Sequence, residues 1–227
     1  MKRGLLIIAG LYGFLTGYPQ SFIQPNYGMK SHETLEISKI EANSKGTSFY
    51  MTIENRIQGG TFCVDRNTFM IYPDGTRSKL LSASGIPVCP DSHKFNAPGE
   101  KLDFVLLFPP LKEGTKWIDL IEECDEHCFS FYGVTLDTEL NQKVNECFTL
   151  AEGEEASRGI IRLIDLIGEI DNKNYGIEGL LYLTIVKLSD EAGSKAIAAE
   201  WYRKMKSSGA PRVGDYLKYL NDNGIRY

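Results

Sequence analysis

The stretch KWIDLIEECDEHCFSFYGVTL, residues 116–136, decides how this chain is expected to fold. Two runs rich in β-branched and aromatic residues flank the polar segment CDEHC, which begins at Cys124 and ends at Cys128. Such runs are typical of strands, and a short polar segment between them favours a hairpin. Residues that face each other in a non-hydrogen-bonded pair have Cα atoms roughly 4.5 Å apart, which a disulfide accepts. The stretch therefore predicts a β-hairpin closed at its tip by a Cys124–Cys128 disulfide.

This pairing predicts a register for the whole hairpin. It places Leu120 opposite Tyr132 and Ile118 opposite Val134 on one face, because side chains alternate along a strand. The other face then receives four apolar side chains: Trp117, Ile121, Phe129 and Phe131.

Two chemical alternatives compete for the same tip. Cys124, His127 and Cys128 are possible zinc ligands, with a carboxylate or His93 as the fourth, but the backbone would have to curl around the ion and abandon strand pairing. A redox pair is the second alternative, although the spacing is not the Cys-x-x-Cys that lowers a thiol pKa at a helix N-terminus. We expect the structural disulfide, with the polar residues of the tip in solvent.

The other three cysteines lie outside the hairpin. Cys63 and Cys89 fall among predicted strands and are the preferred second disulfide, which stabilises by about 3 kcal/mol in the loop-entropy model. Other pairings are open to five cysteines, so this one is a preference. Cys147 lies on the apolar face of a predicted helix and is expected to be a buried free thiol.

Upstream of the hairpin, residues 32–136 consist of short strand-like segments separated by turns. Residues 35–42, 48–55 and 101–108 are such segments, and Pro-Asp-Gly at 73–75 is a strong turn former. Many short strands at this interval favour an antiparallel β-sandwich.

Downstream, from Thr138, the apolar period becomes 3.6 and predicts five helices joined by short loops. The third, residues 175–188, is apolar nearly all round and is expected in the middle of the bundle. Gly209 suits the C-terminal cap of the fourth, and Pro211 the first turn of the fifth. The predicted fold class is α+β with two domains: a β-sandwich at 32–136 and an all-α array at 138–227.

The first residues, MKRGLLIIAGLYGFLTGYPQSF, have the order of charges and apolar residues found in secretory signal peptides. Lys2 and Arg3 precede an apolar run at residues 4–17, which is too short for a comfortable membrane span. We expect residues 1–21 to be a signal peptide and the mature chain to have no membrane span. Export also fits the cysteines, because disulfides persist in oxidising compartments.

Two stretches resemble known families. LDFVLLFPPLKEGTKWIDLIEE at 102–123, followed by FSFYGVTL at 129–136, resembles a segment of exported proteins of Gram-negative gut bacteria. That resemblance implies an immunoglobulin-like sandwich and a periplasmic or outer-envelope location. KAIAAEWYRKMKSSGAP at 195–211 resembles a tetratricopeptide or Sel1-like helix pair, in which a small residue such as Ala198 permits close helix packing. It implies that the helical half holds a protein or peptide partner.

Composition and motifs exclude several classes of partner and of active site. The net charge is −5 and the basic residues are scattered, so we expect no nucleic-acid partner. The sequence holds three histidines and no Gly-x-Ser-x-Gly, His-Glu-x-x-His or Gly-x-x-x-x-Gly-Lys motif, so we expect no catalytic residues, no metal and no cofactor. Four aromatic residues of the helical half are candidates either for core packing or for a partner groove: Trp201, Tyr202, Tyr216 and Tyr219.

Together these patterns predict an exported, non-enzymatic protein of the cell envelope that binds or scaffolds an unknown protein or peptide partner. One alternative is a zinc- or thiol-dependent enzyme that uses the Cys124–Cys128 tip. Another is a carbohydrate-binding sandwich, which would need a row of exposed aromatic residues on the sheets.

Overall fold

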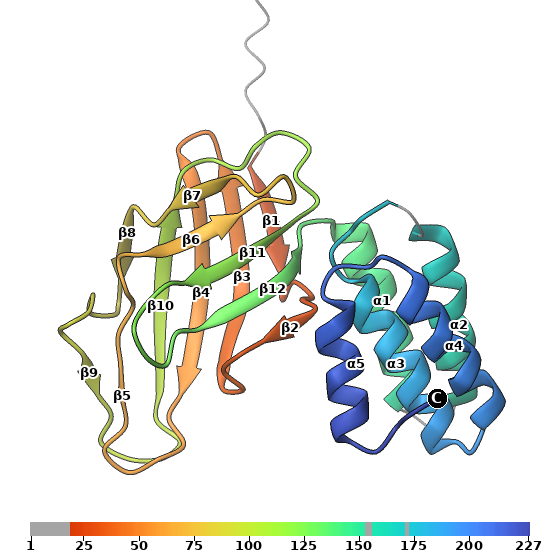
Figure 1. Ribbon diagram of the computed structural model, residues 1–227. Helices are drawn as coiled ribbons and strands as arrows, with labels where there is room; N and C mark the ends of the chain where they lie inside the picture. The colour runs from red at the N-terminus through yellow and green to blue at the C-terminus, as the bar shows by residue number, and fades with distance from the viewer. Residues whose placement is uncertain (1–18, 153–155, 171–172) are drawn as a thin grey trace, which may run out of the picture.

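The computed structural model describes residues 19–152, 156–170 and 173–227. Over these residues the chain forms two five-stranded antiparallel sheets and a two-stranded sheet, followed by five helices (Figure 1). Except for its last three residues, the predicted signal peptide lies outside the described part of the chain. No helix among the described residues is both long and apolar enough to cross a membrane.

The two larger sheets contain all of the long strands. The first has the order β1-β3-β4-β10-β8, formed by Gln20–Ile23, Leu35–Asn43, Gly46–Glu54, Lys101–Phe108 and Ser82–Ser84. The second has the order β2-β12-β11-β6-β7, formed by Met29–Lys30, Ser130–Thr135, Trp117–Glu122, Thr68–Ile71 and Arg77–Lys79. β5 (Thr61–Phe62) pairs with β9 (His93–Lys94) beside them.

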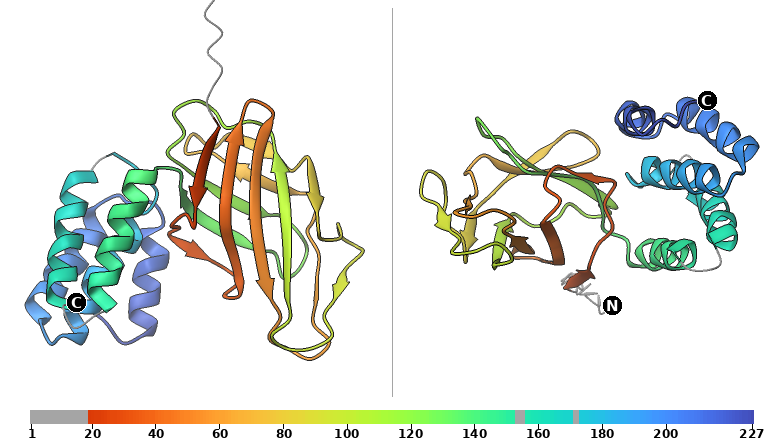
Figure 2. Two further views of the ribbon diagram at one scale, coloured as in Figure 1. Left: turned by 180° about the vertical axis from the view of Figure 1, so that it is seen from behind. Right: turned by 90° about the horizontal axis from the view of Figure 1, so that it is seen from below.

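The sheets pack face to face around one apolar core, as a sandwich does (Figure 2). Phe49 of β4, Phe108 of β10 and Phe131 of β12 are fully buried in it. β4 buries every second side chain along its length, so the alternation in its sequence is the period-2 pattern of a half-buried strand. The sequence did not predict β1 and β2, which lie before residue 32 and join one sheet each.

The hairpin exists, but its register differs from the prediction. Ile118 pairs with Val134 as expected, whereas Leu120 pairs with Phe131 instead of Tyr132, and the shift occurs between Ile118 and Leu120. The Asp119 carboxylate accepts a hydrogen bond from the Gly133 N–H at 2.7 Å. Gly133 has φ 64°, which glycine adopts without strain, so this pair stabilises a bulge.

The bulge decides which side chains reach the core. Phe131 turns into the sandwich core, while Trp117 lies outside it, against the helical region. The predicted face that groups Phe131 with Trp117 is therefore wrong, because a one-residue shift moves a side chain to the opposite face of a strand.

Five helices follow the last strand: α1 (Thr138–Glu152), α2 (Ala156–Ile170), α3 (Glu178–Glu191), α4 (Lys195–Ser207) and α5 (Val213–Asp222). The predicted change of period at Thr138 is confirmed, and the Asp137 carboxylate accepts a hydrogen bond from the Leu140 N–H at 3.0 Å, as a helix cap does. Gly209, with φ 69°, follows α4 as predicted. Pro211 was expected in the first turn of α5 but lies before it, since α5 begins at Val213.

The helices form two layers beside the sandwich. α1, α3 and α5 lie nearer the sheets, and α2 and α4 lie outside them (Figure 2). Trp117 joins the sheet and helical regions: its indole N–H donates to the Asn174 carbonyl at 2.8 Å, and its ring lies against Gly176. Whether residues 32–136 and 138–227 are separate domains stays a prediction.

Candidate functional site

Three of the four aromatic candidates pack inside the helical region. Trp201, Tyr202 and Tyr216 are buried in its core. Burial raises the pKa of the Tyr216 hydroxyl well above its ordinary value. Tyr219 differs, because 46% of its surface is exposed. Only Tyr219 of this set is therefore free to contact a partner directly.

Tyr219 lies on one wall of a groove that we call the α3 groove. Its floor is α3 and its walls come from α1 and α5, and its volume is about 520 Å³. The lining side chains are Phe148, Ala151, Glu152, Leu180, Leu183, Thr184, Lys187, Leu188, Glu191 and Tyr219. An apolar floor with a few polar groups at its edge is the usual composition of a binding groove.

The sequence of α3 explains why the groove is apolar. One side of the helix carries Leu181 and Ile185, which are fully buried in the helical core. Leu180 and Leu183 lie on another side of the helix, and Leu188 lies at the boundary between the two sides. All three are only partly buried and line the groove. The all-round apolar pattern predicted a central helix, but it did not show that one of its faces is left partly uncovered.

The groove continues towards the sheets. A second hollow of about 500 Å³ shares Phe148 and Leu180 with it and extends to Pro25, Tyr27 and Glu36. Because the two hollows have these side chains in common, they adjoin each other at Phe148 and Leu180.

The edge of this surface carries more acidic than basic groups. Glu152 and Glu191 stand on the α1 and α3 sides of the groove, and Lys187 faces Glu191 at 3.9 Å. At the sheet end, Glu36 forms an ion pair with Lys30. Two acidic side chains, Glu152 and Glu191, and one basic side chain, Lys187, line the groove, so its net charge is negative.

The four cysteines predicted to pair are paired in the structure. Cys63 and Cys89 have Cα atoms 5.4 Å apart, and Cys124 and Cys128 have Cα atoms 5.5 Å apart, each with bonded sulfurs. Cys147 is a buried free thiol, and burial raises its pKa. A raised pKa leaves little reactive thiolate near neutral pH.

The carboxylate of Glu122 organises the base of the hairpin tip. It is buried, and it accepts hydrogen bonds from the Asp65 N–H at 2.7 Å and from the Phe129 N–H at 3.0 Å. Burial raises the pKa of Glu122 even though these two donors oppose the shift. Glu122 thus ties the segment after Cys63 to the strand after Cys128.

Two of the predicted alternatives, a metal site and a carbohydrate platform, can be compared with the described residues. In the part of the chain that the structure describes, no three His, Cys, Asp or Glu side chains are grouped to hold a metal ion. Among the described aromatic residues, the exposed ones are Tyr219 and Tyr227, both in the helical region. The sheets therefore present no row of exposed aromatic rings over these residues, as a carbohydrate platform would need.

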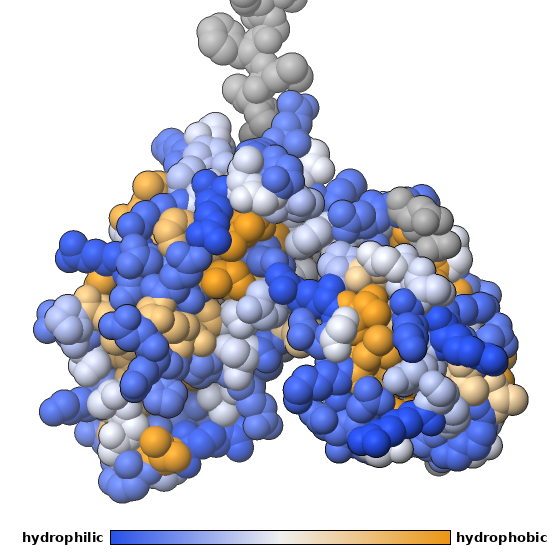
Figure 3. Space-filling model, viewed as in Figure 1, coloured by the Kyte–Doolittle hydropathy of each residue, from blue (hydrophilic) through white to orange (hydrophobic). Residues whose placement is uncertain are grey.

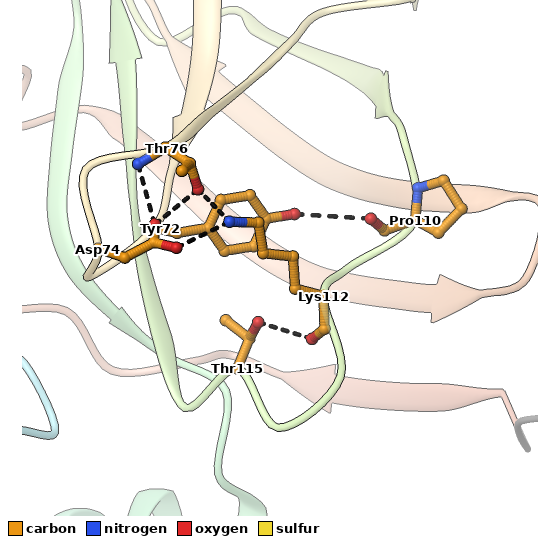
Figure 4. Close-up of polar contacts among 6 residues, drawn as sticks. All are labelled: Tyr72, Asp74, Thr76, Pro110, Lys112 and Thr115. Atoms are coloured by element: carbon orange, nitrogen blue, oxygen red, sulfur yellow. Dashed lines mark hydrogen bonds and ion pairs between the residues drawn. The ribbon is translucent and has the colours of Figure 1, made fainter.

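A polar cluster joins two loops of the sandwich (Figure 4). Lys112, from the loop after Pro110, forms an ion pair with Asp74 at 2.8 Å and lies 4.6 Å from the centre of the Tyr72 ring. Hydrogen bonds from Lys112 and Thr76 hold the pKa of Asp74 well below its usual range. Since each charged group here has a partner, we assign the cluster to loop structure and not to ligand binding.

On the face shown in Figure 3, apolar residues appear as small patches, some over the sheets and some over the helices, separated by hydrophilic residues.

Comparison of the chain with protein-family models, with curated proteins and with solved structures found no match.

Proposed function

We propose that the protein binds a peptide segment of a partner protein in the α3 groove. The observation that carries this proposal is the partly exposed apolar face of α3, flanked by Phe148 and Tyr219 on neighbouring helices. An apolar groove between helices accepts side chains of a peptide that are themselves apolar. The adjoining hollow, which extends to Pro25, gives room for a peptide longer than the groove alone.

The charge of the groove suggests which peptides fit. Glu152 and Glu191 stand at its edge, so a lysine or arginine beside the apolar side chains of the peptide would be attracted to them. Exposed ion pairs add little to the affinity of a complex, but they discriminate against partners of the wrong charge. Their contribution decreases as the salt concentration rises. The proposed partner is therefore a peptide with apolar side chains and a flanking basic residue.

The fold and location that accompany this function are also proposals. We propose that the sandwich is immunoglobulin-like, that the helices are a tetratricopeptide-like array, and that the protein works outside the cytoplasm as a scaffold of the cell envelope. Support for the location comes from the two disulfides, which persist in oxidising compartments.

The test begins with selection of peptides from a displayed random library on the purified protein. Selected peptides are then synthesised, labelled and titrated by fluorescence anisotropy against the wild type, Tyr219→Ala and Leu183→Ala. We expect each substitution to weaken binding about tenfold, the effect of losing roughly 1.4 kcal/mol at a contact residue.

Ile197→Ala is the matched control. Ile197 lies on α4, 40% of its surface is exposed, and it does not line the groove. Its substitution should leave the affinity unchanged. Selected peptides that bind Tyr219→Ala and Leu183→Ala as tightly as the wild type would refute the groove, provided that both variants keep the wild-type circular dichroism.

A further inference from the structure

One cavity brings both disulfides of the protein together. It has a volume of about 670 Å³, lies where β5 runs beside the sandwich, and is lined in part by Cys63, Cys89 and Cys124. His32 and His127 also line it. The cavity shares no lining residue with the α3 groove, so its chemistry is independent of peptide binding there.

The Cys124–Cys128 disulfide is asymmetric with respect to this cavity. Cys124 is among the lining residues and Cys128 is not. The backbone N–H of Cys124 donates a hydrogen bond to the sulfur of Cys128 at 3.0 Å. A donor placed on a sulfur stabilises the thiolate that forms when the disulfide is broken, and a stabilised thiolate leaves faster.

The ends of the tip are held by contacts that do not depend on the disulfide. The Glu122 N–H donates to the Phe129 carbonyl at 3.0 Å, and the Phe129 N–H donates to the Glu122 carboxylate, also at 3.0 Å. The Glu123 N–H donates to the Asn67 carbonyl at 2.8 Å. These bonds keep Cys124 and Cys128 close after reduction, so the pair is arranged to form its bond again.

The Cys63–Cys89 disulfide lacks this asymmetry. The Val64 N–H donates to the Pro87 carbonyl and the Cys89 N–H donates to the Val64 carbonyl, both at 3.1 Å, so the backbone on either side of this disulfide is paired. Over the described residues, no hydrogen bond to either of these sulfurs is found that would stabilise a leaving thiolate. Cys63–Cys89 therefore provides an internal control inside the same cavity.

We propose that Cys124–Cys128 is an exchangeable disulfide, attacked at Cys124 by the thiol of a cysteine-containing peptide that enters the cavity. In the first step the peptide thiolate forms a bond with the Cys124 sulfur, and the Cys124–Cys128 bond breaks. Cys128 leaves as a thiolate. In the second step another thiolate attacks the peptide sulfur, which releases Cys124 as a thiolate and yields an oxidised peptide disulfide.

The electrons and protons balance over the two steps. Two peptide thiols lose two electrons in total, and the protein disulfide gains them to become two thiols. The proton that leaves each attacking thiol passes to solvent, and each protein thiolate takes up a proton from solvent to become a thiol.

Reduced glutathione, a small cysteine-containing peptide, is a direct probe. The wild-type protein is exposed to it for increasing times, quenched with acid, and alkylated with iodoacetamide. Mass spectrometry of proteolytic fragments then locates glutathione and alkyl groups on each cysteine. We expect the tip to open at least about tenfold faster than Cys63–Cys89, with glutathione on Cys124 and the alkyl group on Cys128.

In this measurement, opening of the tip no faster than Cys63–Cys89, or glutathione mainly on Cys128, would overturn the proposal. The measurement uses the wild-type protein, so no variant has to fold. Addition of oxidised glutathione afterwards tests reversibility, and failure of the tip to close again would also refute it. Because the readout is the position of glutathione and not peptide capture, failure here leaves the α3 groove untouched.

Discussion

Replacement of Asp119 by alanine tests the contact between the sheets and the helices. Asp119 is buried, its carboxylate accepts the Gly133 N–H, and it also pairs with Arg212 of the helical region. The variant leaves the buried Gly133 N–H without an acceptor, which costs about 1–3 kcal/mol. The ion pair adds less than about 1 kcal/mol, because 34% of the Arg212 side chain is exposed and solvent screens it.

The expected loss in the free energy of unfolding for Asp119→Ala is therefore about 2–3 kcal/mol. Arg212→Ala should lose only about 1 kcal/mol, because it removes the ion pair and the stacking of Arg212 on Tyr132 but keeps the bond to Gly133. Asp119→Asn is the matched control: its amide oxygen can still accept from Gly133, so it should resemble Arg212→Ala.

Equilibrium unfolding in urea measures these values. Tryptophan fluorescence follows Trp117 at the contact and Trp201 in the helical core, while circular dichroism follows the helices. For a chain of this length, the expected loss lowers Tm by about 4–12 °C. If Arg212→Ala lost as much stability as Asp119→Ala, or more, the bulge would not be the main contribution of Asp119.

Two further predictions concern packing and thiol chemistry. Gly176→Ala should destabilise the protein by about 3 kcal/mol in the same urea assay, because φ is 80° there and an added Cβ would lie 2.5 Å from the Trp117 ring. Gly214→Ala is the control: nothing lies within 4 Å of an added Cβ there, so this substitution should be neutral or stabilising. Equal losses of stability in the two variants would refute this reasoning. Iodoacetamide should alkylate Cys147 more slowly in the folded protein than in urea at pH 8, as measured by mass. Folding raises the pKa of Cys147, so the stability that its thiol contributes is fully present below the pKa of the unfolded chain and is lost as pH rises through the pKa of the folded protein. Cys147→Ala should therefore lose less stability than the wild type as pH rises in this range.

The sequence alone determined the features that depend on local chemistry. Period-2 and period-3.6 patterns predicted the long strands and the five helices. Apolar residues at these spacings fall on one face of a strand or of a helix, and that face packs against a core. The spacing of Cys124 and Cys128 predicted their bond for a similar reason: a short tip between two strands leaves few arrangements of the chain.

Short strands were harder to predict than long ones. β1 and β2 have four and two residues, and they become strands because neighbouring strands offer them hydrogen-bond partners. A segment of that length has too few positions to show a period, so its sequence alone does not predict it.

The tertiary structure decided the features that depend on contacts between distant residues. The register of the hairpin depends on Asp119 and Gly133, which pair only once the strands have met. The α3 groove depends on where α1 and α5 leave the helix uncovered, which a single apolar pattern does not specify. The apolar residues of α3 predicted that it would be central, and only packing determined that Leu180, Leu183 and Leu188 would be left partly open beside Tyr219.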